Sequence, residues 1–99
     1  MGQNNYPYYF PQTSVGLKSA VSLENGNIIK LDWTKAYPSN ANYNLGYNIY
    51  YSTLEKDVFR EGPKYLSIGQ EITSLEIDDF FPGETYYFAV RATQFLPAW

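Results

Sequence analysis

The sequence predicts an all-β domain, and three observations support this prediction. Residues 28–34, 47–53 and 86–92 alternate apolar and polar side chains with a period of two, which is typical of strands with one buried face. Turn residues (Gly, Pro, Asn and Ser) separate these and other short strands at intervals of roughly eight to twelve residues, which favours a sandwich or barrel over βαβ units. Eleven Tyr residues also favour strands over helices.

The chain has the length of one domain. Its 99 residues suffice for a single core, and a hydrophobic content of 44% is too high for a disordered polymer. We expect an N-terminal arm at residues 1–14 and a folded domain at 15–99. The arm contains Pro7 and Pro11, which donate no backbone hydrogen bond, so it is expected to be extended rather than part of a regular element.

Two strands and a turn are expected in the first third of the domain. The first strand spans 15–23, with a break near Ser19, and the Asn-Gly pair in 24–27 makes a turn because it tolerates positive φ. The second strand spans 28–34. Its core-facing side chains are Ile29, Leu31 and Trp33, and its solvent-facing side chains are Lys30 and Asp32.

A loop and a third strand follow. Residues 36–46 are rich in Pro, Ser, Asn and Gly and are therefore expected to form a loop. In the strand at 47–53, the core-facing side chains are expected to be Tyr47, Ile49 and Tyr51, and the solvent-facing ones Asn48, Tyr50 and Ser52. The charged connection at 54–64 has room for one helical turn, which Gly62 and Pro63 would end.

Three further strands complete the expected domain. Short strands are predicted at 64–69 and at 72–78, where Leu75 and Ile77 point inward. The last strand follows the stretch FFPGETYYFAVRA, residues 80–92. Its core-facing side chains are expected to be Tyr86, Phe88, Val90 and Ala92.

The Pro82-Gly83 pair predicts a tight reversal before the last strand, because Pro fixes φ and Gly accepts positive φ. Phe80 and Phe81 cannot both face inward at such a reversal. We therefore expect Phe80 to be in the core and Phe81 to be partly exposed. The hydroxyl of Tyr86 needs a partner as its ring enters the core, and a nearby backbone group can supply one.

The ordered combination of these motifs resembles a fibronectin type III domain over residues 15–93. The motifs are the buried Trp of LDW, the alternating Tyr-x-Ile-x-Tyr strand, and the Pro-Gly-x-x-Tyr corner with its aromatic ladder. The resemblance implies an immunoglobulin-like, two-sheet antiparallel sandwich with a tyrosine corner. The expected structural core comprises Trp33, Tyr47, Ile49, Tyr51, Leu75, Ile77, Phe80, Pro82, Gly83, Tyr86, Phe88 and Val90.

The resemblance also implies one more strand after the aromatic ladder, and the sequence given stops at TQFLPAW. An unpaired final strand would expose a row of backbone donors and acceptors. Three explanations remain open at this point. The sequence is a fragment of a longer chain, the N-terminal arm or a neighbouring chain supplies the strand, or the apolar tail covers the edge.

The composition argues against catalysis and against several classes of partner. The chain has no Cys and no His, which removes disulfides, the common zinc sites and His-based triads. The one acidic cluster, Asp78-Asp79 with Glu76 and Glu84 nearby, is expected to be a solvated turn. We therefore expect no enzyme activity, no catalytic or metal-binding residue and no cofactor.

The charge distribution limits the partners in a similar way. The net charge is −3 and the seven basic residues form no cluster, so no nucleic acid partner is expected. No apolar run approaches the length that spans a membrane, so no membrane insertion is expected. The loop at 37–45 combines Tyr and Asn as binding loops do.

A binding surface made of aromatic side chains is the functional feature that remains. Its expected members are Tyr6, Tyr8, Tyr9, Phe10, Tyr37, Tyr43, Phe81 and Trp99. The alternative is that outward rings cover the sheet faces as cross-strand pairs, for example Tyr50 against Tyr87.

These expectations favour a non-catalytic structural or interaction module. Fibronectin type III domains occur in receptors, in secreted bacterial glycosidases and in virions of tailed bacteriophages. The sequence starts with Met and shows no export signal. We therefore expect the N-terminal domain of a phage head, neck or tail protein that acts in assembly or surface attachment.

Such a protein is made in the host cytoplasm and located in the virion. Its expected partners are proteins, either neighbouring subunits or downstream domains of the same chain. The alternative is a carbohydrate-binding or spacer module of a secreted bacterial glycosidase or surface adhesin. That module would be extracellular and would have a glycan as its partner.

Overall fold

The structure is a computed structural model that describes residues 13–23 and 26–95. This part of the chain is almost entirely β-structure, which confirms the predicted class. Its elements, in order, are β1 (Thr13–Ser14), β2 (Leu17–Leu23), β3 (Ile28–Trp33), β4 (Asn44–Ser52), the 3-10 helix η2 (Glu55–Asp57), β5 (Tyr65–Gly69), β6 (Ser74–Ile77) and β7 (Tyr87–Phe95).

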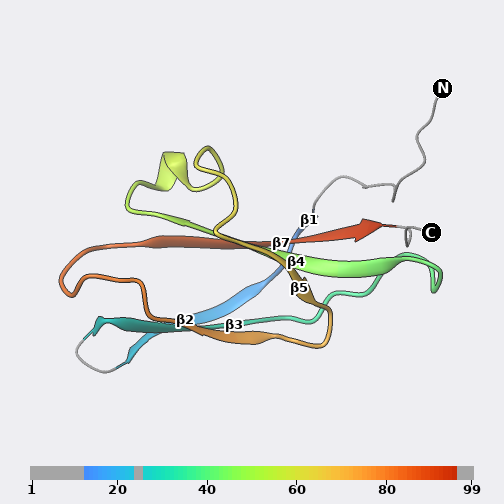
Figure 1. Ribbon diagram of the computed structural model, residues 1–99, viewed down its shortest axis with the longest axis horizontal. Coiled ribbons are helices and arrows are strands. Elements are labelled where there is room, and N and C mark those ends of the chain that lie inside the picture. The colour runs from blue at the N-terminus through green and yellow to red at the C-terminus, as the bar shows by residue number, and fades with distance from the viewer. Residues whose placement is uncertain (1–12, 24–25, 96–99) are drawn as a thin grey trace.

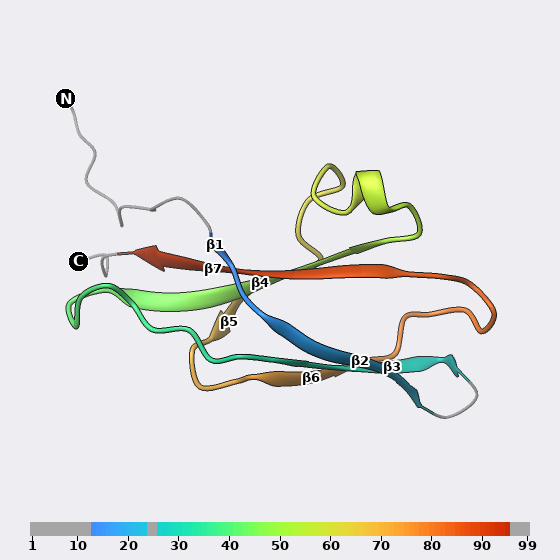
Figure 2. The same ribbon diagram turned by 180° about the vertical axis from the view of Figure 1, so that it is seen from behind.

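Two antiparallel sheets pack face to face. One has the strand order β1-β7-β4-β5 and the other the order β2-β3-β6. Figure 1 shows the two layers along the long axis of the molecule, and Figure 2 shows them from behind. The principal-axis extents are 50 × 25 × 20 Å. The fold is therefore an elongated two-sheet sandwich.

The core lies between the sheets and is filled by inward side chains from both. The largest fully buried side chains are Trp33, Tyr47, Leu31, Ile49, Ile77 and Val90. Of the other expected core residues, Tyr51 and Phe80 are buried, and Leu75, Tyr86 and Phe88 are half-buried against this cluster. Alternation with a period of two places these residues on one face of each strand.

Pro82 and Gly83 are exposed, so their assignment to the core is corrected. The reversal that they form joins β6 to β7 outside both sheets, and Pro82 lies beside Gly26 in the turn between β2 and β3. Gly83 has φ +85°, which an L side chain adopts only at a cost. The pair therefore shapes the chain and does not fill the interior.

Strand β4 is buried on both faces, which differs from the expectation that Asn48, Tyr50 and Ser52 face solvent. Every residue from 45 to 52 is buried. Residues 53–64, called the outer segment here, fold back over the outer face of β4. The buried Val58 and the ring of Phe59, whose centroid lies 5.0 Å from that of Tyr50, cover the strand.

Hydrogen bonds hold the outer segment on the sheet. The Lys64 N–H donates to the Ile49 carbonyl at 2.7 Å, and the Ser52 hydroxyl donates to the Glu61 carboxylate at 2.9 Å. The bond from Ser52, with a further one from Lys64, lowers the pKa of Glu61. The outer segment is therefore a fixed part of the domain and not a free connection.

The edge strand β5 contains a bulge. Its register against β4 shifts between Tyr47 and Ile49, and Ser67 adopts φ +57°. The Ser67 N–H donates to the Asn48 side-chain oxygen at 3.1 Å, and Gly46 lies so close that an added Cβ would be 3.1 Å from the Ser67 Cα. A bulge at an edge disturbs the row of backbone groups that another chain would pair with.

The edge of β7 is partly occupied by the first strand. Thr13 pairs with Ala92 and Ser14 with Arg91, and the Val15 N–H donates to the Val90 carbonyl at 2.9 Å. Residues 13–14, assigned to the arm by sequence, thus form β1. The chain then crosses to the other sheet, and β2 shows a register shift between Leu17 and Ser19, beside the expected break.

Candidate interaction surface

The described residues show no arrangement typical of metal binding. In residues 13–23 and 26–95, no group of three or more Asp or Glu side chains is placed to hold a metal ion. Glu76, Asp78, Asp79 and Glu84 are all exposed. Within the same ranges, no helix is long and apolar enough to cross a membrane.

The corner between β6 and β7 separates two adjacent aromatic residues. Phe80 is 4% exposed and packs against Tyr51 and Tyr86 with ring centroids 5.0 and 4.6 Å away, whereas Phe81 is 74% exposed. The Phe81 N–H donates to the Tyr86 hydroxyl oxygen at 3.0 Å, and the Glu84 N–H donates to the Phe81 carbonyl at 3.2 Å. Phe81 therefore projects from a fixed turn.

Tyr51 lies beneath this corner in an environment that disfavours its ionised form. Burial raises the pKa of Tyr51 to about 12, and the Asp79 carboxylate, which accepts a hydrogen bond from the Tyr51 hydroxyl at 3.3 Å, adds to the rise. The protonated hydroxyl is therefore retained in the folded state at pH values where an exposed Tyr would ionise.

This shift predicts a loss of stability in alkali. The unfolded chain releases the Tyr51 proton near pH 10 and the folded chain releases it near 12. The stabilisation is therefore fully present below pH 10 and is lost as the pH rises through this interval. Urea unfolding at pH 9 and 11 should show a smaller loss in Tyr51→Phe than in the parent, and equal losses would contradict the prediction.

The loop between β3 and β4 carries a second strongly exposed ring among the described residues that the sequence assigned to the surface. Tyr37 is 73% exposed. The Tyr47 hydroxyl accepts the Ala36 N–H at 2.8 Å and donates to the Gln70 carbonyl at 3.0 Å. The Gln70 amide in turn donates to the Ala36 carbonyl at 2.9 Å. The base of the loop is thus anchored beside Tyr37.

Charged and polar side chains fix the same loop further. Lys35 forms an ion pair with Glu71 at 2.8 Å, and this hydrogen bond raises the pKa of Lys35. The Lys35 ammonium also lies 5.3 Å from the Tyr37 ring centroid. The Ser39 N–H donates to the Gln94 side-chain oxygen on β7 at 2.7 Å.

The structure does not bring the described members of the predicted surface into one patch. Figure 1 places the β3–β4 loop with Tyr37 and the β6–β7 corner with Phe81 at opposite ends of the long axis. Tyr43 is half-buried and has its own interactions. The remaining predicted members, which are Tyr6, Tyr8, Tyr9, Phe10 and Trp99, lie outside the described residues.

A further cluster on the outer face of the four-stranded sheet was missed by sequence reasoning. The Arg91 guanidinium carbon lies 3.4 Å from the Phe59 ring centroid and 5.5 Å from that of Tyr50. In the register of β4 and β7, Tyr50 is directly opposite Ala89 and Tyr87 is directly opposite Ser52. The alternation over residues 86–92 predicts that Arg91 faces away from the core. No pattern in the sequence predicts that Phe59 lies beside it.

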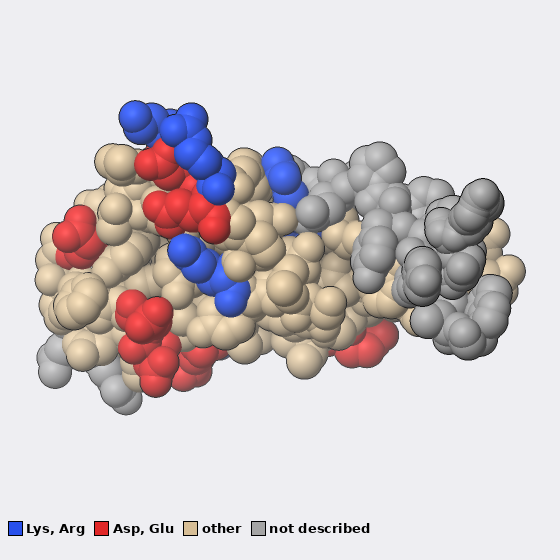
Figure 3. All heavy atoms as spheres, turned by 45° about the horizontal axis from the view of Figure 1, so that its top comes forward, with Lys and Arg blue, Asp and Glu red and all other residues tan. Residues whose placement is uncertain are grey.

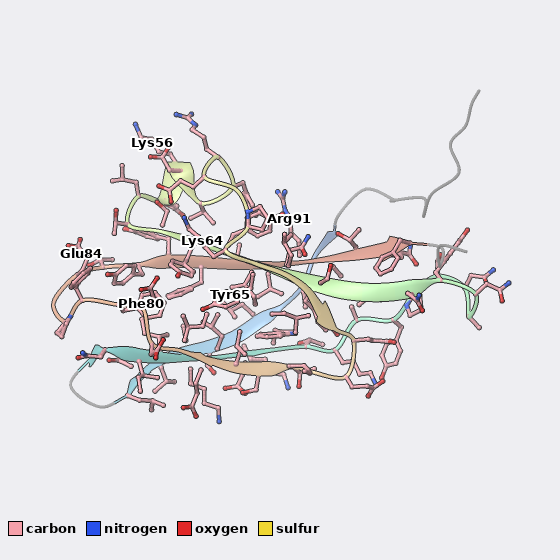
Figure 4. All side chains as sticks on the ribbon, in the orientation of Figure 1. Lys56, Lys64, Tyr65, Phe80, Glu84 and Arg91 are labelled. Carbon is pink, nitrogen blue, oxygen red and sulfur yellow. The ribbon has the colours of Figure 1, made fainter. Side chains whose placement is uncertain are left out.

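Figure 4 shows Arg91 rising from β7 beside the outer segment, with Lys56 and Lys64 on that segment. Figure 3 shows basic and acidic side chains close together on this face. The arrangement suits recognition of another protein by an arginine on an aromatic base, a combination common in interface hot spots.

Comparison with known proteins gives no match to any protein-family model, to any curated protein or to any solved structure.

Proposed function

We propose that the chain is a non-catalytic structural or interaction module. The observation that supports this function best is the placement of Tyr37 and Phe81. Both rings are almost three-quarters exposed, both sit on loops fixed by hydrogen bonds, and the loops occupy opposite ends of the sandwich. An aromatic side chain on an ordered loop has few rotatable bonds to fix on binding, so each end is suited to hold a neighbouring protein.

Within this proposal, the domain is of the fibronectin type III kind. Support comes from the strand order, from Trp33 buried on β3, and from the hydrogen bond between the Tyr86 hydroxyl and the Phe81 N–H. The last is the bond that a tyrosine corner makes to the backbone a few residues upstream. The resemblance implies a further strand after the aromatic ladder, next to the ladder strand. In this chain, β1 occupies part of that edge of β7.

The biological setting that we propose is a bacteriophage virion, in which the domain belongs to a head, neck or tail protein. There it acts in assembly or surface attachment and contacts neighbouring subunits or downstream domains. This setting rests on analogy with the family and not on a site in the molecule. A glycan-binding module would use neighbouring coplanar rings, whereas the loops that carry Tyr37 and Phe81 lie at opposite ends of the sandwich.

A particle-incorporation experiment tests the proposal. The tagged chain, expressed during phage growth, should co-purify with particles at constant stoichiometry. Tyr37→Ser or Phe81→Ser should reduce incorporation while the thermal melt stays unchanged. Leu66→Ser is the matched control, because Leu66 is 64% exposed on β5 and away from both loops.

Two results would count against this function. Incorporation that is unaffected by both loop variants would show that these ends make no essential contact. Binding of the isolated domain to a glycan array, abolished by Tyr37→Ser, would instead support the carbohydrate-binding alternative.

A further inference from the structure

Arg91 is a half-buried cation without an anionic partner in the described structure. The ion pairs among residues 13–23 and 26–95 join Lys35 to Glu71, Arg60 to Asp57 and Lys64 to Glu61. The outer segment carries three basic and three acidic residues, so its charges cancel and Arg91 supplies the net positive charge of this face. Its guanidinium, held on the Phe59 ring, still has donors available for a carboxylate.

The corner between β6 and β7 has the complementary character. No Lys or Arg occurs between residues 65 and 90. Four carboxylates around the turn, those of Glu76, Asp78, Asp79 and Glu84, take part in none of the ion pairs of the described residues. Phe81, which is 74% exposed, lies between Asp79 and Glu84 in the sequence. We call residues 76–84 the acidic tip and the group formed by Arg91, Phe59 and Tyr50 the arginine platform.

We propose that the acidic tip of one copy of this chain docks onto the arginine platform of a second copy. A tip carboxylate would pair with the Arg91 guanidinium in the bidentate geometry that arginine favours. The exposed Phe81 ring would pack on the exposed part of Phe59, which is 42% exposed. This inference rests on the proposal that the chain is an interaction module, and it specifies the partner of one of its two ends.

The rigidity of the tip favours this contact. The bonds from the Phe81 N–H to Tyr86 and from the Glu84 N–H to Phe81, together with the Pro82-Gly83 reversal, fix the turn before any partner arrives. The platform is equally fixed, because the Lys64–Ile49 and Ser52–Glu61 bonds hold the outer segment. Little order has to be imposed on binding, which lowers its entropic cost.

The two surfaces occupy different parts of the molecule, as Figure 4 shows for Glu84 and Arg91. The contact is therefore heterologous, and each copy keeps a free tip and a free platform after one contact has formed. Contacts of this kind produce rings when the rotation closes and open chains when it does not. Self-association should therefore proceed beyond a dimer.

Sedimentation velocity over a concentration series tests the proposal directly. The parent should show a mass that rises with concentration, and added salt should weaken the association because the ion pair is screened. Phe81→Ser and Arg91→Gln should each reduce the association constant about tenfold or more, as hot-spot residues do. The matched controls Leu66→Ser and Lys18→Gln, at an exposed apolar and an exposed basic position, should leave it unchanged.

A mixture of two variants separates this contact from nonspecific aggregation. Phe81→Ser keeps an intact platform, and Arg91→Glu keeps an intact tip. Each variant alone should remain a monomer. Their mixture should form a dimer and stop there, because one productive contact remains for each pair. Circular dichroism melts of both variants verify that they are folded.

A parent that stays monomeric at all soluble concentrations would overturn the proposal. So would an association constant in Phe81→Ser and Arg91→Gln that equals that of the parent, or a mixture that forms no dimer although both variants are folded. These failures are distinguishable from failure of the proposed function. A monomeric chain whose particle incorporation still depends on Tyr37 and Phe81 would remain an interaction module with another partner.

Discussion

Replacing Trp33 with Ala is expected to lower the free energy of unfolding by about 3–5 kcal/mol, the range for truncation of a large buried aromatic residue. Trp33 is 1% exposed and lies at the centre of the core, where its ring meets Tyr47 edge to face with centroids 5.6 Å apart. The cavity would open between the two sheets, so neither sheet could close it without moving. Urea unfolding followed by far-ultraviolet circular dichroism measures the loss.

Trp33→Phe is the control for this substitution. The Trp33 ring nitrogen is buried without a hydrogen-bond partner in the described structure, so its replacement with Phe breaks no hydrogen bond. The cavity that Phe leaves is also smaller than the cavity that Ala leaves. We expect its loss of stability to be clearly smaller than that of Trp33→Ala. A Trp33→Ala protein that melts like the parent would show that the core is wrongly placed.

Phe80→Ala and Phe81→Ala are expected to differ sharply although they change adjacent residues in the same way. Phe80 is 4% exposed and packs on Tyr51, Tyr86 and Phe88, so its truncation should cost about 3–5 kcal/mol. Phe81 is 74% exposed, so its truncation should change stability by no more than about 0.5 kcal/mol. Parallel urea titrations of the two variants measure the difference.

Each variant is the other's control, because backbone effects of the Phe-to-Ala change are shared. Similar losses in both would mean that the corner does not divide the pair between core and solvent. The reverse order would mean that the turn is shifted by one residue, since a one-residue slip exchanges the two faces of a strand.

The sequence by itself determined the features that depend on local chemistry. Alternation at Leu31 and Trp33 and at Phe88 and Val90 predicted which strand faces enter the core, because a half-buried strand repeats every two residues. The Pro82-Gly83 pair predicted the reversal, because few other residues adopt its backbone angles at low cost. The all-β class followed from these local signals and needed no knowledge of the pairing.

Other features depended on contacts between segments that are distant in the sequence. Tyr50 has the pattern of an exposed residue, and the return of the outer segment over β4 places the Phe59 ring against it. The pairing of β1 with β7 was one of three alternatives that the sequence left open, because a two-residue strand leaves no periodic pattern.

The candidate interaction sites show the same division. The residue type marked Tyr37 and Phe81 as candidates, but the sandwich places them at opposite ends of the molecule. Arg91 and Phe59 are 32 residues apart in the numbering and meet only because residues 53–64 cross the outer face of the sheet. Periodicity reports which face a side chain occupies, whereas tertiary packing decides what covers that face and which side chains become neighbours.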